Sequence, residues 1–317
     1  MKSHHLPLVN NSPELSIIIC TYNRADLLIF SLQALAKQTL NRDKFEIIVI
    51  DNNATDHTQQ VLTDFCEQFF PVKYFLESKQ GLSHARNRGV AEAFGKYVAF
   101  IDDDAKAVPE WASLILHAFE NVQPQPLAVG GTAFPWYESN PPDWFTEDFE
   151  KRYWGEKAIF LEKKRAKFGF GGLNMAFQKK IIVELGGFAI DLGVTEYKTR
   201  MGEDADLFYK IWKANQDKSD KIFWYNPLIK VLHFTPIRNW QVPYRKQRSL
   251  KSGEAWAIIE QTKPFSILFF KMLAFLLLQP FYLIFNVLQF KNPVKTEYVK
   301  FLQNLCFAKG YLYQSFL

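Results

Sequence analysis

Three consecutive carboxylates, Asp102, Asp103 and Asp104, follow directly on an apolar segment at residues 97–101. A buried strand gains no stability from ending in three like charges, because they repel one another and resist removal from water. A divalent cation such as Mg²⁺ or Mn²⁺ removes this conflict, since hard cations prefer oxygen ligands. Alternation along a strand places Asp102 and Asp104 on one side and Asp103 on the other. The pattern favours a metal site over its alternative, a solvated loop rich in Asp.

Polar residues also follow two other apolar segments, residues 15–20 and 46–50. A segment with helical periodicity separates them, and this alternation predicts parallel strands joined by right-handed crossovers. In such sheets ligands bind at the carboxyl ends of the strands. Each polar residue taken alone is compatible with an ordinary turn. Taken together they predict one shared site, made by Thr21, Asn23, Asp51 and the three consecutive Asp residues.

The composition bounds the class of protein. With 317 residues, 48% of them hydrophobic, the chain can form one large α/β domain with an extension or two modest domains, and global disorder is excluded. A net charge of +5 is too small to indicate nucleic acid, and no such partner is expected. Three widely separated cysteines match neither a metal site nor a disulfide framework, which favours a reducing compartment. Residues 1–14 lack the apolar core of a signal peptide, so we expect a cytoplasmic location.

The sequence contains no glycine-rich phosphate loop, neither G-x-G-x-x-G nor G-x-x-x-x-G-K-S/T. A dinucleotide-dependent dehydrogenase and a P-loop enzyme are therefore disfavoured. Any phosphate must be held by a metal ion and by cations such as Arg86. Three further arginines, on a flexible or helical stretch, could close over donor phosphates: Arg238, Arg245 and Arg248.

Five segments stand in a fixed order along the chain: SIIICTYNR at 16–24, EIIVIDNNATD at 46–56, GLSHARNRG at 81–89, YVAFIDDD at 97–104 and GEDADL at 202–207. Their order and spacing resemble a family 2 glycosyltransferase with the GT-A fold, over roughly residues 15–240. The resemblance implies an inverting enzyme that moves a sugar from a nucleotide-sugar to a hydroxyl group. The donor would be UDP-, GDP- or dTDP-linked, and the cofactor Mg²⁺ or Mn²⁺.

The resemblance also implies roles on the donor side. The residues expected to bind the nucleotide-sugar are Thr21, Tyr22, Asn23, Arg24, Asp51, Asn53, Arg86, Asp102 and Asp103. Asp104 is the expected direct metal ligand, together with Asp102 and His233. Such a metal stabilises the negative charge that develops on the leaving nucleoside diphosphate. For His233, which stands alone in its segment, a structural role is an even alternative.

On the acceptor side, Asp204 matches the family's general base, which must take the proton of the attacking hydroxyl. The alternative is a carboxylate in a first helical turn, where capping and the helix dipole favour it. Residues 134–155 are crowded with aromatic side chains, and we expect an irregular acceptor wall in which Trp136 stacks on a sugar. A loop pinned to the core by its Trp residues is as good an interpretation. Three more residues are expected to contact the acceptor: Glu203, Gly172 and Asn174.

Residues 264–290 are predominantly apolar, and their few polar side chains form a narrow stripe at roughly helical spacing: Lys271, Gln279, Asn286 and Gln289. The length suffices for one membrane span. The stripe fits an in-plane helix or a hairpin kinked at Pro280 better. A soluble helix packed on the domain or on a second subunit is the alternative. We expect this segment to attach the protein to the cytoplasmic face of the inner membrane.

The sequence therefore predicts an α/β protein of the GT-A type, with a Rossmann-like, mostly parallel sheet flanked by helices and a C-terminal hydrophobic helical extension. We expect an N-terminal tail at 1–14, a catalytic domain at 15–250 and the helical extension at 251–317. Within the domain, residues 15–105 would bind the nucleotide and residues 106–250 the acceptor.

The predicted function is transfer of a sugar to a saccharide or lipid-linked acceptor, in cell-surface polysaccharide synthesis. One alternative is a nucleotidyltransferase acting on sugar phosphates, which would be expected to carry a glycine-rich triphosphate loop. Another is a catalytically inactive scaffold that binds nucleotide-sugars. The presence of both Asp104 and Asp204 counts against a scaffold.

Overall fold

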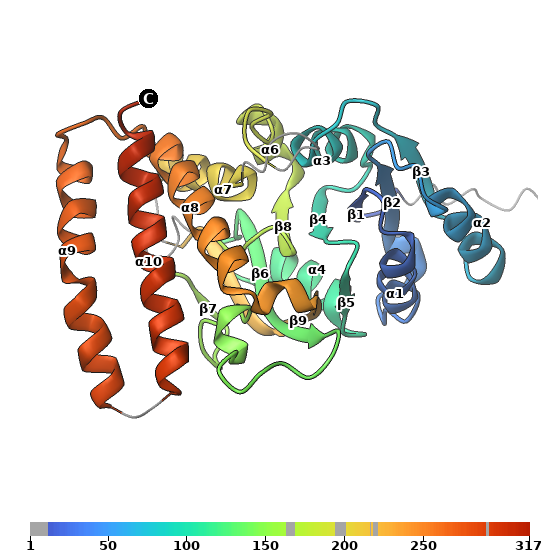
Figure 1. Cartoon of the computed structure of the whole chain (residues 1–317). Coiled ribbons are helices and arrows are strands. Elements are labelled where there is room, and N and C mark those ends of the chain that lie inside the picture. The colour runs from blue at the N-terminus through green and yellow to red at the C-terminus, as the bar shows by residue number, and fades with distance from the viewer. Residues whose placement is uncertain (1–11, 163–168, 194–200, 216, 218–220, 290–291) are drawn as a thin grey trace, which may run out of the picture.

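The computed structural model describes residues 12–162, 169–193, 201–215, 217, 221–289 and 292–317. Within these residues a nine-stranded sheet runs through the centre of the molecule in the order β3-β2-β1-β4-β8-β6-β9-β5, and β7 pairs with β9 (Figure 1). The strands are β1 (Leu15–Thr21), β2 (Phe45–Asp51), β3 (Lys73–Leu76), β4 (Tyr97–Ile101), β5 (Ala105–Ala107), β6 (Ala128–Tyr137), β7 (Ile159–Phe160), β8 (Asn174–Gln178) and β9 (Phe223–Thr235).

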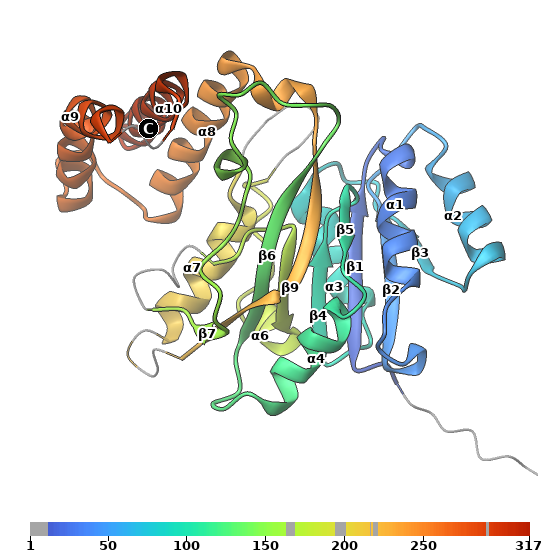
Figure 2. The same ribbon diagram turned by 90° about the horizontal axis from the view of Figure 1, so that it is seen from below.

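Helices cover both faces of the sheet, and three more extend the molecule beyond its β6–β9 side (Figure 2). The helices on the sheet are α1 (Ala25–Ala36), α2 (Thr58–Gln68), α3 (Leu82–Glu92), α4 (Trp111–Asn121), α6 (Lys179–Glu184) and α7 (Glu203–Asn215). The C-terminal helices are α8 (Val242–Ile259), α9 (Ile267–Leu288) and α10 (Val294–Gln314). Short 3₁₀ turns are η1 (Arg42–Lys44), η2 (Glu147–Phe149) and η3 (Ile237–Trp240).

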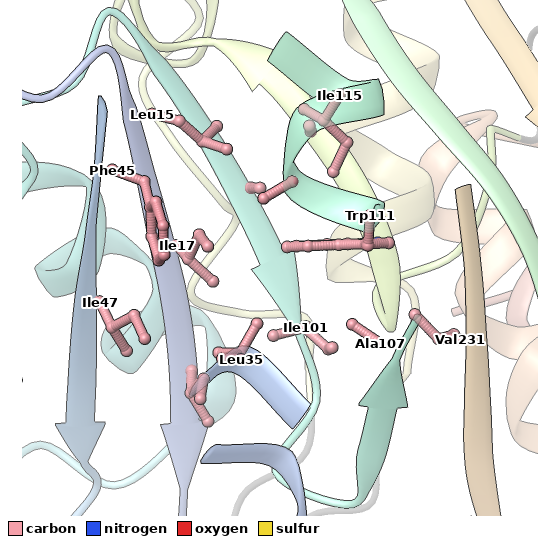
Figure 3. Packing of buried hydrophobic residues seen from close by; sticks show 14 of the residues in the cluster. Leu15, Ile17, Leu35, Phe45, Ile47, Ile101, Ala107, Trp111, Ile115 and Val231 are labelled. Carbon is pink, nitrogen blue, oxygen red and sulfur yellow. The ribbon is translucent and has the colours of Figure 1, made fainter. Parts of the chain in front are cut away.

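The central strands are mostly apolar, as expected for strands with both faces buried. Ile17 of β1 belongs to a cluster with Leu35 of α1 and Trp111 of α4 (Figure 3). The next residue, Ile18, belongs to the cluster on the opposite face, with Phe208 of α7. This alternation holds β1 between two helical layers and places its carboxyl end at a fixed edge of the sheet.

The sheet is mixed rather than purely parallel. β1 pairs in parallel with β2 and β4, and β2 with β3, as predicted for the nucleotide-binding half. The next strand, β8, runs antiparallel to both β4 and β6, and β5 runs antiparallel to β9. Antiparallel neighbours need no helical crossover, so a strand from late in the chain can enter the middle of the sheet.

One predicted segment has a different structure. Residues 134–137 continue β6 and pair in parallel with β9, so the segment expected to be irregular begins as a strand. Strand β6 extends this far because β9 offers it a partner that is remote in the sequence.

The C-terminal helices form one packed layer. Helix α8 continues through residue 250, so the predicted domain boundary falls inside a helix. Glycines permit close contact between α8 and α10: a Cβ at Gly253 would lie 2.0 Å from the Phe307 carbonyl oxygen, and one at Gly310 would lie 2.1 Å from that of Leu250. The backbones can approach only because neither glycine has a side chain.

Helix α9 is the outermost element and lies along α10 (Figures 1 and 2). Within the described residues it is the one helix long and apolar enough to cross a membrane, judged by length and composition only. The predicted polar stripe is divided: Gln279 is 2% exposed and accepts a hydrogen bond from Asn304 of α10. Lys271, Asn286 and Gln289 remain exposed among apolar side chains. The outward face of α9 is therefore more apolar than the sequence pattern indicated.

Candidate active site

The carboxyl ends of β1, β2 and β4 bring the predicted donor residues to one edge of the sheet. Parallel pairing sets Thr21 opposite Asp51. Thr21 Oγ1 donates a hydrogen bond of 2.8 Å to Asp103 Oδ2, which links the end of β1 to the Asp-rich turn after β4. Ser31 of α1 supports this turn, because its hydroxyl donates to the Asp103 carbonyl oxygen at 2.8 Å. Ser31 was not predicted, and nothing in its local sequence identifies it.

Asp103 and Asp104 share Arg24 as a partner, so the predicted alternation does not separate these two carboxylates. Arg24 Nη1 donates to Asp103 Oδ1 at 3.1 Å and to Asp104 Oδ2 at 2.7 Å. Burial raises the pKa of the Asp103 carboxyl to about 7, and the negative charge of Asp104 adds to this, while Arg24 opposes it. Arg24 therefore offsets the repulsion within the acidic turn.

Asp102, Asp104 and His233 could hold a metal ion. Each offers one ligand atom, and the three atoms lie within 4.8 Å of one another. Ala105 of β5 pairs with His233 of β9, and this pairing places the imidazole near the carboxylates. The sequence alone does not show this proximity, because the two segments are far apart in the chain. Burial alone would lower the pKa of His233, but Asp104 outweighs it and raises that pKa.

The donor set fits a divalent cation. Asp104 Oδ1 lies 3.1 Å from His233 Nε2, yet this buried oxygen makes no hydrogen bond. A buried carboxylate oxygen without a partner costs free energy, which a cation would offset. Two carboxylates and one imidazole suit Mn²⁺ or Mg²⁺, with further positions left for phosphate oxygens.

The loops after β1 and β2 are held by hydrogen bonds in tight turns, and some of their side chains are exposed to solvent. Asp51 Oδ1 accepts from the Ala54 amide at 2.7 Å, and its Oδ2 accepts from the Tyr74 hydroxyl at 2.9 Å. Asn23 Oδ1 accepts from the Thr55 amide at 2.7 Å. Both Asn23 and Asn53 have positive φ angles, which Asn tolerates better than most residues. Tyr22 is half-buried, and Asn23 and Asn53 are exposed at this edge.

Arg86 links the Asp-rich turn to the start of α7. The side chain is almost fully buried; its Nη1 pairs with Glu203 Oε1 at 2.5 Å, and its Nη2 lies 3.7 Å from Asp102 Oδ1. Burial raises the pKa of Glu203, Asp204 adds to the effect, and Arg86 opposes it. Gly172 makes room for the guanidinium, because a Cβ there would lie 2.3 Å from Arg86 Nη2.

Asp204 lies beside this pair and is half-buried. Its Oδ2 accepts a hydrogen bond of 2.6 Å from the Gly172 amide, a group outside its own helix. Asp204 therefore does more than cap helix α7, because its carboxylate also contacts a different segment of the chain. The structure thus brings Arg86, Gly172, Glu203 and Asp204 together.

Trp136 and Asn174 lie elsewhere. Trp136 pairs with Phe234, and its ring packs against Phe30 of α1, with Lys106 Nζ 3.0 Å from the ring centroid. Asn174 is buried; it accepts from Trp111 and donates to the carbonyl oxygens of Thr132 and Ile229. These contacts favour a structural role for Asn174, and they hold Trp136 on the α1 side of the sheet.

Two of the three predicted arginines pair with Glu150, a residue that the sequence did not indicate. Arg245 and Arg248 are on α8, and both pair with Glu150 of the segment between β6 and β7. Arg238 is exposed, near the ring of Tyr244. A local sequence signal exists only for the arginines, which are three residues apart on one helix face. Their partner lies some hundred residues earlier and has no such signal.

The chain matches the family described as Glycosyl transferase family 2 over residues 16–186. Among similar curated proteins, a glucosyl-dolichyl phosphate glucuronosyltransferase of Haloferax volcanii is 26% identical over 213 residues, which is 65% of this chain and 65% of that protein. A validoxylamine A glucosyltransferase of Streptomyces hygroscopicus subsp. jinggangensis is 35% identical over 120 residues, 37% of this chain and 28% of that protein. The chain thus spans less than two thirds of the length of either relative.

Solved structures support the fold. The mannosyltransferase PcManGT from Pyrobaculum calidifontis, in complex with GDP-Man and Mn²⁺, gives a TM-score of 0.56 at 18% identity, over 94% of this chain and 73% of that one. TarS from S. aureus in complex with UDP gives 0.51 at 16% identity, over 75% of this chain and 65% of that one. At such identities the likeness concerns the fold alone. The GT-A prediction is confirmed, with the sheet mixed rather than purely parallel.

Proposed function

Because this chain belongs to glycosyl transferase family 2, we propose that it transfers a sugar from a nucleotide-sugar to an acceptor hydroxyl, with inversion at the anomeric carbon. One observation carries the proposal: the buried guanidinium of Arg86 pairs with Glu203, beside Asp204, and reaches toward Asp102. It joins a carboxylate of the metal site to the start of the helix that bears the acceptor-side carboxylate. The two sides of an inverting transfer therefore adjoin one another.

The donor would lie along the carboxyl edge of β1, β2 and β4. Tyr22, Asn23 and Asn53 are the side chains there with surface open to a nucleoside. Thr21 and Asp51 are buried and bonded within the protein, so they shape this edge and keep its loops in place. The comparison structures hold GDP-Man or UDP, which supports a nucleotide-linked donor but does not select the base.

The metal site and Asp204 would divide the chemistry between them. Asp102, Asp104 and His233 would hold a divalent cation, which would supply Lewis-acid stabilisation of the leaving nucleoside diphosphate. Asp204 accepts the proton of the acceptor hydroxyl, while the Gly172 amide fixes the orientation of its carboxylate. Arg86 balances the charge between these carboxylates, and Glu203 orients the acceptor.

The acceptor would be a saccharide or a lipid-linked sugar of cell-surface polysaccharide synthesis. One relative is named for action on glucosyl-dolichyl phosphate, a lipid-linked sugar. The exposed apolar helix α9 supports a place at a membrane surface. We assign the chain to the cytoplasmic face of the inner membrane, attached through residues 264–290, where a cytosolic donor and a membrane acceptor meet.

A donor panel tests this function. UDP-, GDP- and dTDP-sugars are incubated with the protein, Mn²⁺ and saccharide or lipid-linked acceptors, and released nucleoside diphosphate is measured. We expect release with one nucleotide class, dependent on acceptor, abolished by EDTA and reduced in Asp204→Asn. Pyrophosphate released from a nucleoside triphosphate would indicate a nucleotidyltransferase instead. Donor binding without turnover on any acceptor would indicate a binding protein.

A further inference from the structure

A cluster of three arginines, one buried and two partly buried, lies outside the groups to which the proposed function gives a role. Arg245 of α8 pairs with Glu150 and donates to the Phe149 carbonyl oxygen at 3.0 Å. Arg248, one helical turn later, donates to both oxygens of Glu150 at 3.1 Å. Within the described part of the chain, Glu150 is the one carboxylate paired with either arginine. The segment before β7 is thereby fastened to α8.

Arg152 adds a third guanidinium, and among the described residues no carboxylate pairs with it. Its Nη1 donates only to the backbone oxygens of Lys151, at 3.1 Å, and Glu150, at 3.5 Å. Paired backbone hydrogen bonds with Ala133 join this part of the chain to β6, so the base of the side chain is held in place. Burial and the positive charge of Arg248 lower the pKa of Arg152.

The cluster has more positive charge than its surroundings compensate. Arg245 and Arg248 share one carboxylate, that of Glu150, and among the described residues Arg152 has no paired carboxylate, so the cluster has an excess of positive charge. Arg245 Nε and Asn239 Oδ1 are also buried without hydrogen-bond partners. Buried charges and donors are costly unless they are paired. An anion bound at the cluster would offset this cost.

Two arginines of the cluster are accessible to a ligand, and the cluster adjoins strands β6 and β9. Arg152 and Arg248 are partly exposed, with 26% of the Arg248 side chain accessible, whereas Arg245 and Glu150 are buried behind them. Ala133, the backbone partner of Arg152, pairs with Val231 of β9, two residues before His233. Asp204 is near enough to offset part of the lowering of the pKa of Arg152. An anion here would therefore be a neighbour of the proposed base.

We propose that Arg152 and Arg248 form an anion subsite that binds a phosphate or diphosphate group of the acceptor while the acceptor hydroxyl lies at Asp204. The proposal rests on the proposed function, because it names the chemical class of that acceptor. Planar guanidinium groups match phosphate oxygens in paired hydrogen bonds. In the proposed function, a divalent cation balances the charge of the donor diphosphate. The positive charge of Arg152 and Arg248 therefore remains available to a phosphate of the acceptor.

Direct binding tests the subsite without requiring turnover. Metal-free protein is titrated by calorimetry with hexyl glucosyl phosphate and, separately, with hexyl glucoside, which lacks the phosphate. We expect the phosphate compound to bind at least tenfold more tightly. Arg152→Gln should remove most of that difference, since hydrogen bonds to charged groups account for roughly a tenfold effect. Arg152→Lys, which keeps the charge, should retain part of it.

Two variants serve as controls. Arg238→Gln removes the same charge from an exposed position of η3 and should bind the phosphate compound like the wild type. Asp104→Ala removes a metal ligand and should also leave this metal-free binding unchanged. Tighter binding in Asp104→Ala, which has lost a carboxylate that repels phosphate, would place the phosphate at the metal site and overturn the proposal. So would equal affinity of the wild type for the two glucosyl compounds.

A vesicle measurement separates an acceptor phosphate from a lipid headgroup. Sedimentation with phosphatidylcholine vesicles is compared with and without phosphatidylglycerol, for the wild type and for Arg152→Gln. We expect equal sedimentation of the two proteins. If the variant loses anionic vesicles but keeps hexyl glucosyl phosphate, the arginines bind headgroups and the acceptor assignment is wrong. Since no step needs a donor, a failure of the proposed function in the donor panel remains distinguishable from a failure here.

Discussion

The two oxygens of the Asp104 carboxylate have different neighbours: Oδ2 accepts from Arg24, and Oδ1 faces His233 without a hydrogen bond. We predict that Asp104→Ala abolishes Mn²⁺-dependent binding of nucleoside diphosphate, because the ligand set loses its most buried carboxylate. Calorimetry with UDP and GDP in Mn²⁺, and in EDTA as the control, measures the change. Unchanged affinity in Mn²⁺ would remove the metal from this site.

Asp204 is expected to affect turnover rather than donor binding. Its carboxylate is held by the Gly172 amide, and it is not among the residues that could hold the metal. For Asp204→Asn we predict a fall in kcat of about 10²- to 10⁴-fold, the usual effect of losing a general base. Donor affinity should stay within about twofold. Turnover near that of the wild type would show that this carboxylate only supports helix α7.

Glu150 should contribute to stability in a pH-dependent way. Burial alone would raise its pKa, but Arg248 and Arg245 outweigh burial and hold it below the ordinary value of 4.5. A depressed pKa means that the contribution is complete above pH 4.5 and is lost as the pH falls further. Removing one partner of a buried pair costs about 3 kcal/mol or more. We therefore predict that Glu150→Gln lowers the free energy of unfolding by this amount at pH 7 and by less at pH 4.

Urea unfolding at both pH values checks this prediction. Glu147→Gln is the matched control, since Glu147 pairs with Lys151 at the surface and contributes roughly 0.5 kcal/mol or less. A Glu150→Gln variant that loses no more stability than the control would show that the pairing of Glu150 with the arginines does not stabilise the fold. An equal loss at pH 4 and pH 7 would contradict the pKa direction.

At the scale of elements, the sequence predicted the strands and site residues that follow from local sequence patterns. The strands β1, β2 and β4 and the donor residues at their ends follow from apolar runs that stop at polar residues. The order of strands β8, β6 and β9 does not, because each pairing is set by packing between segments remote in the chain. For the same reason, the link between Glu150 and α8 could not be predicted. The sequence indicated Arg245 and Arg248, but it did not indicate that Glu150 is their partner.

Gly172 connects two elements of the site, so a small change there should affect both. An added Cβ would lie 2.3 Å from Arg86 Nη2, and the Gly172 amide supports Asp204. We predict that Gly172→Ala displaces the guanidinium and lowers kcat at least tenfold, with a melting temperature within a few degrees of that of the wild type. Gly171→Ala is the control: nothing lies within 4 Å of its Cβ position, although its φ of +90° disfavours a side chain. If both variants lose activity equally, strain in the loop rather than Arg86 is responsible.

At the scale of the whole molecule, the C-terminal helices are part of the structure that holds the acceptor side. Thr296 of α10 donates a hydrogen bond of 2.6 Å to the Trp144 carbonyl oxygen, and Val299 packs in a cluster with Phe145 and Phe149. Removing every residue after 263 would therefore expose this cluster and the surface of α8. Membrane attachment has to be tested by changing the outward face of α9 instead, with α10 left in place.

Helix α9 exposes large apolar side chains that no described residue covers, among them Leu277, Phe281 and Leu288. Isolated exposed apolar residues are common, but a contiguous apolar face on a helix at the edge of the molecule indicates a lipid or protein partner. We predict that replacing these three residues with Ser abolishes sedimentation with liposomes, because each buried apolar side chain contributes roughly 1.5–3 kcal/mol to membrane binding. Donor binding should not change. The matched control replaces three exposed apolar residues elsewhere, Val183, Ile190 and Leu228, and should sediment like the wild type. If the wild type ignores liposomes but dimerises, and the α9 variant is monomeric, the face binds a second copy of the chain and the membrane assignment is wrong.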